Sequence, residues 1–428
     1  MGFKPTSALL QHFHSCASGR YSSIEVHVET SDAPNGSLMS DKKKVDTTIV
    51  TVGRDPEANF GIINPPVYHA STILYPTVAA LKGRNTKVTY GRRGTPTTFA
   101  FQDAVAELEG GYRSLVTPSG LSACSVSLLA HLKAGDHLLV TDTVYGPTRA
   151  FCDTVLTKFG IDVEYYEPNL GAGISDLMRP TTRVVYTEAP GSQTFEMQDI
   201  PAIAKAAHAG DATVIMDNTW ASPYFCQPFE LGADIAIQAA TKYIVGHSDV
   251  MMGTITTNEE TWRDTIKAHG TIGITAGPDD IYLALRGLRT LSVRLQRHME
   301  TGILLAKWLQ DRPEVSRVLH PALPTDPGHE IWKRDFKGAS GLFGVILKPV
   351  SETAIAAMLD NLELYGMGYS WGGYESLIIP AYPADNRTAT NWAPEGPLLR
   401  IHVGLEDPGD LIADLEAGFD RLNAASDK

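Results

Sequence analysis

Short apolar runs alternate with segments of helical spacing between about residue 105 and residue 258. In segments such as "LSACSVSLLAHLKAG" and "DIPAIAKAAHAG", apolar residues recur three and four positions apart and a glycine follows. This alternation predicts a largely parallel sheet covered by helices on both faces, which is an α/β fold. The predicted strands are residues 113–118, 137–142, 163–168, 183–190, 213–219, 234–239 and 252–258.

The pattern changes after residue 280. Residues 281–310 place apolar side chains on one face and predict a long amphipathic helix or a helix pair. Its four arginines could form a phosphate-binding patch, a solvated face or an oligomer contact: Arg286, Arg289, Arg294 and Arg297. Residues 341–350 and 397–407 then predict two strands, and residues 407–423 predict a helix. The C-terminal part is therefore expected to be a second, smaller α+β domain.

The composition excludes several classes of protein. With 428 residues, 43% of them hydrophobic, the chain can bury a large core. Its formal net charge of −13 argues against nucleic acid as a partner, and no apolar run approaches the roughly 20 residues of a membrane span. The four cysteines have neither CxxC nor zinc spacing, which predicts free thiols, no metal site and a cytoplasmic location.

The first 38 residues are weakly basic and rich in serine, without the continuous apolar stretch of a secretory signal. Met39 opens "MSDKKKVDTTIVTVGRDP", which has the character of a natural start. We expect residues 1–38 to be a disordered extension or to result from an upstream mis-start. His12, His14 and Cys16 resemble metal ligands, but no metal role is expected in such a segment.

Three polar features lie at predicted strand ends, where sheets of this kind bind ligands. In "VTPSGLSACS" a helix follows a strand at Ser119–Gly120, so its free N–H groups could hold an anion or simply be capped by the serine. Asp217 ends the strand "ATVIMD", as a cap or as a ligand-facing carboxylate, and Lys242 follows another strand 25 residues later. Together they suit pyridoxal 5′-phosphate (PLP), which offers a phosphate, a pyridine nitrogen and an aldehyde.

Other residues permit two interpretations each. Tyr145 follows a strand end, where it could stack on a flat ring or fill the rim of the core. Arg400 interrupts an apolar strand, so it binds either a substrate carboxylate or an internal acid. Tyr90 and Arg92 belong to a glycine-rich loop that, taken alone, reads as a basic surface loop.

Six segments carry a family resemblance that covers residues 39–425: "TYGRRGTPT", "PSGLSA", "MDNTW", "QAATKYIVGHSD", "YSWGGYESL" and "LRIHVGLEDPGDLIADLEAGF". They resemble the Cys/Met-metabolism family of PLP-dependent enzymes. The resemblance implies the aspartate aminotransferase type of fold, fold type I, with a mostly parallel seven-stranded sheet. It also implies an N-terminal arm over 39–95 that contacts a neighbouring subunit, a PLP-binding domain over 96–288 and a C-terminal domain over 289–428.

The resemblance assigns cofactor roles to residues at these positions. Lys242 would be the Schiff-base lysine and the general base, Asp217 would face the pyridine nitrogen, and Tyr145 would stack on the ring. Three further groups would hold the phosphate, namely the backbone N–H groups of Gly120 and Leu121 and the hydroxyl of Thr241. From a neighbouring subunit, Tyr90 and Arg92 would reach the same phosphate, which implies a dimer and usually a dimer of dimers. Tyr90 or Tyr145 would assist proton transfer.

The substrate roles fall on the C-terminal part of the chain. Arg400 and the Ser370 region would take the substrate α-carboxylate, and Trp371 marks the β-lyase branch. Ala239 stands where many members have a serine, which leaves one phosphate contact in question. Within the family the resemblance is closest to the bacterial branch that cleaves L-cystathionine by α,β-elimination to homocysteine, pyruvate and ammonia.

Other activities are also compatible with the sequence. They are a broader β-lyase acting on cysteine S-conjugates, and a γ-lyase or γ-synthase of the same family. Outside the family, the chain could be a non-catalytic α/β protein that binds a phosphate ligand.

Overall fold

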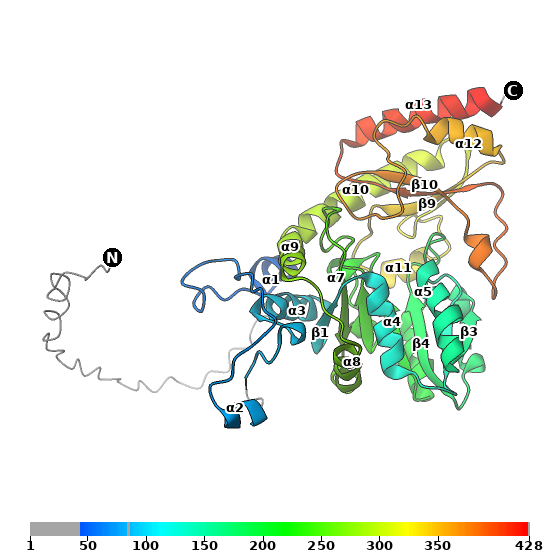
Figure 1. Cartoon of the computed structure of the whole chain (residues 1–428). Helices are drawn as coiled ribbons and strands as arrows, with labels where there is room; N and C mark the ends of the chain where they lie inside the picture. The colour runs from blue at the N-terminus through cyan, green and yellow to red at the C-terminus, as the bar shows by residue number, and fades with distance from the viewer. Residues whose placement is uncertain (1–42, 84–85, 427–428) are drawn as a thin grey trace, which may run out of the picture. The chain divides into compact units, whose positions relative to one another are not determined.

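The computed structural model describes residues 43–83 and 86–426, all of which belong to one compact unit (Figure 1). The expected extension over residues 1–38, with His12, His14 and Cys16, lies outside the described residues. None of the described helices combines the length and the apolar composition needed to cross a membrane.

A seven-stranded sheet forms the first half of this unit, in the order β1-β7-β6-β5-β4-β2-β3. Five neighbouring strands from β6 to β3 run parallel, while β7 is antiparallel to both β6 and β1. The prediction of a mostly parallel sheet is thus confirmed, and each predicted strand exists. The strands are β1 Arg113–Thr117, β2 His137–Thr141, β3 Asp162–Tyr166, β4 Thr182–Glu188, β5 Thr213–Asp217, β6 Ile235–Gln238 and β7 Gly253–Thr257.

Helices cover both faces of this sheet, because alternate strand residues point to opposite sides. Leu138 and Val140 pack in one cluster with helix α4, whereas Leu139 between them packs in another with helix α6. The helical segments up to residue 288 are α1 Val45–Thr51, α2 Val78–Gly83, η1 Gly91–Arg93, α3 Pro96–Glu109, α4 Gly120–His131, α5 Gly146–Phe151, η2 Cys152–Leu156, η3 Thr157–Phe159, η4 Pro168–Leu177, α6 Ile200–Ala209, α7 Ser222–Phe225, η5 Pro228–Leu231, α8 Glu259–Ile272 and α9 Pro278–Leu288.

A four-stranded antiparallel sheet follows, in the order β10-β11-β9-β8, and packs with helices α10, α12 and α13. Two of its strands, β8 and β10, were not predicted, and both lie at its edges. The elements are α10 Leu291–Gln310, β8 Val315–Leu319, α11 His329–Asp335, β9 Leu342–Leu347, α12 Glu352–Leu359, β10 Leu377–Ala381, η6 Pro383–Asn386, β11 Leu398–His402 and α13 Pro408–Ser426.

The predicted helix over 281–310 is a pair, α9 and α10, and one of its arginines corrects the sequence interpretation. The Arg294 side chain is buried and donates to the carbonyl oxygens of Tyr243, Ile244 and Gly287. It therefore belongs neither to a phosphate patch nor to a solvated face. Its guanidinium secures the chain immediately after Lys242 against the start of the C-terminal region.

Candidate active site

Asp217 and Lys242 lie at the same edge of the seven-stranded sheet. Asp217 is the last residue of β5, and it pairs in register with Ile237 of the parallel strand β6. The turn that carries Lys242 follows β6 directly. Because the carboxyl ends of neighbouring parallel strands meet at one sheet edge, the carboxylate and the amine face a common region.

The amine of Lys242 is half-buried and has a lowered affinity for protons. Its Nζ donates to Ser370 Oγ at 2.8 Å and lies 5.3 Å from the centre of the Trp371 ring. Burial and the positive charge of Arg400 lower the pKa of Lys242 to about 8, although Asp217 opposes the shift. A lysine with such a pKa can supply a neutral amine near physiological pH.

Asp217 is a buried carboxylate held by neutral groups. It is 8% exposed and accepts hydrogen bonds from the backbone N–H of Thr219 at 3.0 Å and from the Thr219 hydroxyl. Burial raises its pKa, while Thr219 and Lys242 lower it. Among the described residues it forms no ion pair with an arginine or a lysine. The capping interpretation fails, since the nearest helix, α7, has Ala221 as its N-cap.

Tyr145 is the N-cap residue of α5 and is 42% exposed. Its backbone N–H donates to Glu188 Oε2 at 2.7 Å. Burial raises the pKa of the Tyr145 hydroxyl, with contributions from Cys124 and Asp217, and nearby Arg400 opposes the shift. The charges of Asp217 and Arg400 therefore both act on the Tyr145 hydroxyl, which indicates that the three side chains lie close to one another.

The start of α4 provides the expected anion-binding end of a helix. Gly120 is its first residue, and a Cβ there would fall 2.5 Å from the Cβ of Ala239. Glycine is required at 120 because the helix approaches the end of β6 so closely. Ser119 caps the helix by accepting from Ser122 N, so the first N–H groups at Gly120 and Leu121 keep no partner within the helix.

Thr241 differs from the expectation in one respect. Its hydroxyl donates to the carbonyl oxygen of Met252 at 3.1 Å and accepts from the Met252 N–H at 2.8 Å. The hydroxyl thus joins the turn of Lys242 to the segment that enters β7. A phosphate contact from Thr241 would need this hydrogen to turn away from Met252.

Arg400 approaches Lys242 from the four-stranded sheet, since both side chains form hydrogen bonds with Ser370. It is the central residue of β11, opposite Ile379 of β10 and Gly344 of β9. Its Nη2 donates to the carbonyl oxygens of Tyr369 at 2.8 Å and Ser370 at 3.3 Å. Burial lowers the pKa of Arg400 to about 10, and no acidic side chain among the described residues forms an ion pair with it. The alternative of an internal acid partner is therefore not supported.

Tyr90 and Arg92 form no contact with Lys242 or Asp217 among the described residues of this chain. Tyr90 is 45% exposed, and the Arg92 guanidinium lies 5.1 Å from the centre of its ring. Arg92 lines a separate cavity of about 490 Å³ with residues such as Tyr112 and Trp262, and neither Lys242 nor Asp217 contributes to its lining.

Two side chains that the sequence analysis missed contact the site. Glu188 ends β4 as Asp217 ends β5, so the same strand-end signal could have revealed it. Burial and the charge of Asp217 raise the pKa of Glu188 well above its usual value. Cys124 Sγ lies 4.0 Å from Asp217 Oδ2 and accepts from Tyr186 Oη at 3.3 Å, but a helical cysteine gave no signal.

Known proteins match the chain over nearly its whole described length. Residues 46–420 match the family described as Cys/Met metabolism PLP-dependent enzyme. The chain belongs to this family.

Cystathionine beta-lyase MetC of Escherichia coli is 44% identical over 395 residues, which is 90% of this chain and 100% of that protein. An L-alanine/L-glutamate racemase of Wolbachia pipientis is 39% identical, over 90% of this chain and 99% of its own length. The solved structure of cystathionine gamma synthase from Xanthomonas oryzae, in complex with aminoacrylate and cysteine, superposes with a TM-score of 0.82 at 31% identity. It covers 90% of this chain and 100% of that one. The fold of this chain is that of the PLP-dependent enzymes of fold type I.

The cofactor of the family, pyridoxal 5′-phosphate, suits the groups assembled here. The buried carboxylate of Asp217, which forms no ion pair within residues 43–83 and 86–426, suits a protonated ring nitrogen. The lowered pKa of Lys242 suits bonding to an aldehyde, and the start of α4 suits a phosphate. Within the described residues, no cluster of three or more His, Cys, Asp or Glu side chains could hold a metal ion.

Proposed function

We propose that this chain is a PLP-dependent carbon–sulfur lyase that cleaves L-cystathionine by α,β-elimination, releasing homocysteine, pyruvate and ammonia. The observation that carries the proposal is the position of Lys242 Nζ, which donates a hydrogen bond to Ser370 Oγ and lies 5.3 Å from the centre of the Trp371 ring. The similarity to cystathionine beta-lyase MetC over 90% of the chain supports the same reaction.

The cofactor supplies an electron sink for the charge that develops at the substrate Cα. For this role, Lys242 would hold the cofactor covalently. The negative charge of Asp217 would stabilise the protonated form of the cofactor's ring nitrogen. Tyr145 would stack on the ring, with its backbone fixed by Glu188. The N–H groups of Gly120 and Leu121 would take the phosphate, together with Thr241 once its hydroxyl turns from Met252.

Lys242 would also move the proton that starts the elimination. Its amine, released when substrate binds, would take the proton from the substrate Cα. Burial and Arg400 favour the neutral form of this amine, which is the form that can accept a proton. Arg400 would bind the substrate α-carboxylate, since its guanidinium is partly desolvated and has no acidic partner among the described residues. The Ser370 hydroxyl and the Trp371 ring would lie beside the bound substrate.

We further propose that the site is completed by a second copy of the chain, in a dimer and then a dimer of dimers. Tyr90 and Arg92 lie away from Lys242 in their own chain, so a role at the phosphate requires them to come from a neighbour. The region expected to act as an arm, residues 39–95, exposes large apolar side chains, among them Phe60 at 98%, Leu74 at 87% and Val78 at 68%. Such exposure on a folded chain indicates a surface that another chain covers. The cofactor domain over 96–288 and the C-terminal domain over 289–428 complete the proposed organisation.

A cytoplasmic location is part of the same proposal. Cys124, Cys152 and Cys226 are buried free thiols, as is usual for enzymes of a reducing compartment.

Product analysis after incubation with L-cystathionine tests the proposed reaction. We expect pyruvate and homocysteine in equal amounts, with Lys242→Ala protein giving neither. Formation of 2-oxobutyrate and cysteine would instead show γ-cleavage. Faster release of pyruvate from S-alkylcysteines than from L-cystathionine would show a broader β-lyase, and conversion of L-alanine to D-alanine as the sole reaction would show a racemase. Any of these three outcomes would overturn the proposal.

A further inference from the structure

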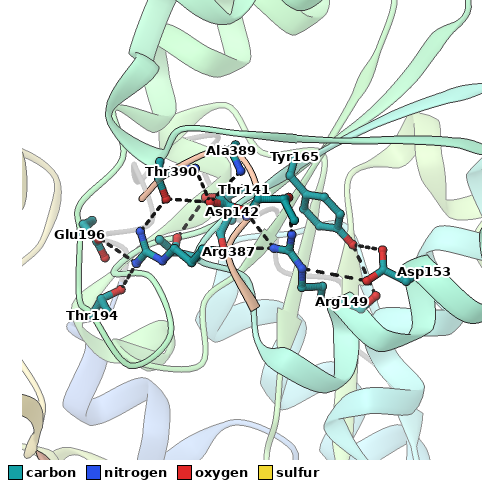
Figure 2. Close-up of polar contacts among 12 residues, drawn as sticks. Thr141, Asp142, Arg149, Asp153, Tyr165, Thr194, Glu196, Arg387, Ala389 and Thr390 are labelled. Carbon is teal, nitrogen blue, oxygen red and sulfur yellow. Dashed lines mark hydrogen bonds and ion pairs between the residues drawn. The ribbon is translucent and has the colours of Figure 1, made fainter. Parts of the chain in front are cut away.

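Asp142 is a buried carboxylate outside the cofactor site, at the carboxyl end of β2 and three residues before Tyr145. Its side chain is 0% exposed, yet it accepts five hydrogen bonds (Figure 2). Three come from consecutive backbone N–H groups of a remote segment, at 3.0, 3.1 and 2.8 Å. The donors are Arg149 Nη1, Thr388 N, Ala389 N, Thr390 N and Thr390 Oγ1. We call this group of residues the latch.

The charge of Asp142 makes these bonds strong. Its ion pair with Arg149 measures 3.0 Å, and Arg149 Nη2 also donates to Thr388 Oγ1 at 2.6 Å. The Arg149 guanidinium lies 3.5 Å from the centre of the Tyr165 ring, which fixes its plane. Burial alone would raise the pKa of Asp142, but the bonds from Thr388, Thr390 and Arg149 lower it below its usual value. The carboxylate is therefore charged at neutral pH and holds its donors by charge-assisted hydrogen bonds.

A second contact ties the same segment to the strand edge. Arg387, with only 5% of its side chain exposed, forms an ion pair with Glu196 at 2.8 Å and also bonds Thr194 and Thr390 (Figure 2). Glu196 lies in the turn after β4, and this turn returns to β2 through the bond from Ser192 N to Thr143 O at 2.8 Å. The segment is thus held against the ends of both β2 and β4.

The latch joins the two parts of the chain that must cooperate in binding substrate. Residues 382–397 connect β10 to β11, and β11 carries Arg400. In Figure 1 this orange segment descends from the four-stranded sheet to α5, while α10 makes the covalent connection on the other side of the view. On the opposing sheet, Asp142 leads directly into Tyr145. The latch therefore joins a segment that ends ten residues before Arg400 to a carboxylate three residues before Tyr145.

We propose that Asp142 is a positioning residue for substrate: it fastens residues 388–390 to the end of β2 and so sets Arg400 opposite Tyr145. The proposal rests on the proposed function for the roles of these two residues. Without the latch, residues 388–390 would no longer be fixed at the end of β2, and the position of Arg400 relative to Tyr145 would be less closely defined. The loss would weaken amino-acid binding and leave the proton transfer at Lys242 intact.

The test compares Asp142→Ala with Asp153→Ala in cofactor-loaded protein. Asp153 bonds Tyr165 and lies 4.0 Å from Arg149, so it touches the same arginine without touching residues 387–390. Two measurements are made: the affinity for L-alanine, from the change in visible absorption, and the amide exchange of residues 383–397. For Asp142→Ala we expect about tenfold weaker L-alanine binding and a KM for L-cystathionine raised by a similar factor, with kcat changed by less than about twofold. Exchange at 388–390 should accelerate, and Asp153→Ala should match wild type.

A matched series separates positioning from general damage. Asp142→Asn keeps one acceptor oxygen and should fall between wild type and the alanine variant. If Asp142→Ala does not fold, the pair Thr388→Val and Thr390→Val removes only side-chain bonds and should raise the KM by about threefold. Faster exchange at 388–390 with unchanged L-alanine affinity and KM would overturn the proposal, as would a fall in kcat without a change in KM. Binding of L-alanine does not require C–S cleavage, so a wild-type protein that fails to cleave L-cystathionine would refute the proposed function and leave this test standing.

Discussion

The residues around Lys242 are assembled within one chain, whereas Tyr90 and Arg92 of the expected arm lie apart from them. Asp217 and Arg400 both act on the charge of Lys242 within a single chain, and each of the three side chains is held by hydrogen bonds. Tyr90 is exposed, and Arg92 contacts the Tyr90 ring and lines a cavity apart from Lys242. Asp217 and Lys242 are brought together by the seven-stranded sheet, and Arg400 comes from β11 of the four-stranded sheet of the same chain. The proposed role of Tyr90 and Arg92, in contrast, depends on a neighbouring chain.

The groups proposed to act on the substrate and those proposed to bind the cofactor phosphate from the arm therefore have separate structural origins. A parallel sheet brings the ends of its strands together whatever the oligomeric state, so the amine and the carboxylate are in place when the chain folds. A phosphate contact from residues 90 and 92 would arise only on assembly. Variants of the two groups should therefore behave differently.

Lys242→Ala should abolish activity and the visible absorption of lysine-bonded cofactor, since the same amine holds the cofactor and takes the proton. The expected loss is at least about 10⁴-fold in kcat. Spectra and pyruvate release of purified protein measure it. Lys242→Arg, which keeps the charge but not the reactive amine, should be equally inactive. Retained yellow colour and turnover in either variant would remove Lys242 from its role.

Arg400→Ala should raise the KM for L-cystathionine by about a hundredfold and lower kcat less, because a bidentate contact to the substrate carboxylate is lost. Arg400→Lys keeps the charge without the planar fork and should recover only part of this loss. Steady-state kinetics with both variants measure the effect. A KM equal to that of wild type in Arg400→Ala would refute the carboxylate contact.

Arg92→Ala should weaken PLP binding by about tenfold, since one charged phosphate contact disappears while the helix end at Gly120 remains. The neighbouring variant Arg93→Ala is the control, because no cofactor role falls on it. Titration of apoprotein with PLP gives both dissociation constants. Equal affinities for the two variants would contradict a role for Arg92 at the phosphate.

How far the sequence predicts the structure depends on where each signal lies. Apolar runs predicted all the strands of the large sheet, and the polar residues at their ends predicted that Asp217 and Lys242 would meet. The edge strand β10 escaped because Pro380 interrupts its apolar run, and a proline is tolerated only at such an edge. The burial of Arg294 was equally invisible, since the carbonyl groups that it binds come from residues 243, 244 and 287. Only tertiary contact determines such positions, and the latch at Asp142 belongs to the same class.

The smallest effect concerns the pH dependence of cofactor capture by the apoprotein. Burial and Arg400 lower the pKa of Lys242 to about 8, so the neutral amine becomes the main form above that pH. Between pH 8 and pH 7 its neutral fraction falls about fivefold, and the rate of capture at fixed PLP should fall equally. Stopped-flow absorption measures this rate. An unshifted lysine would instead give a rate that keeps rising up to about pH 10.4.

Co-expression of two variants tests whether Lys242 of one chain acts together with Tyr90 and Arg92 of another. Lys242→Ala lacks the amine, and the double variant Tyr90→Ala/Arg92→Ala lacks the arm contacts. When the two are co-expressed under different tags, random pairing gives mixed dimers in which one of two sites has every group. We predict that pyruvate release from L-cystathionine recovers to about a quarter of the wild-type value. Activity no higher than the sum of the separate variants would contradict the account.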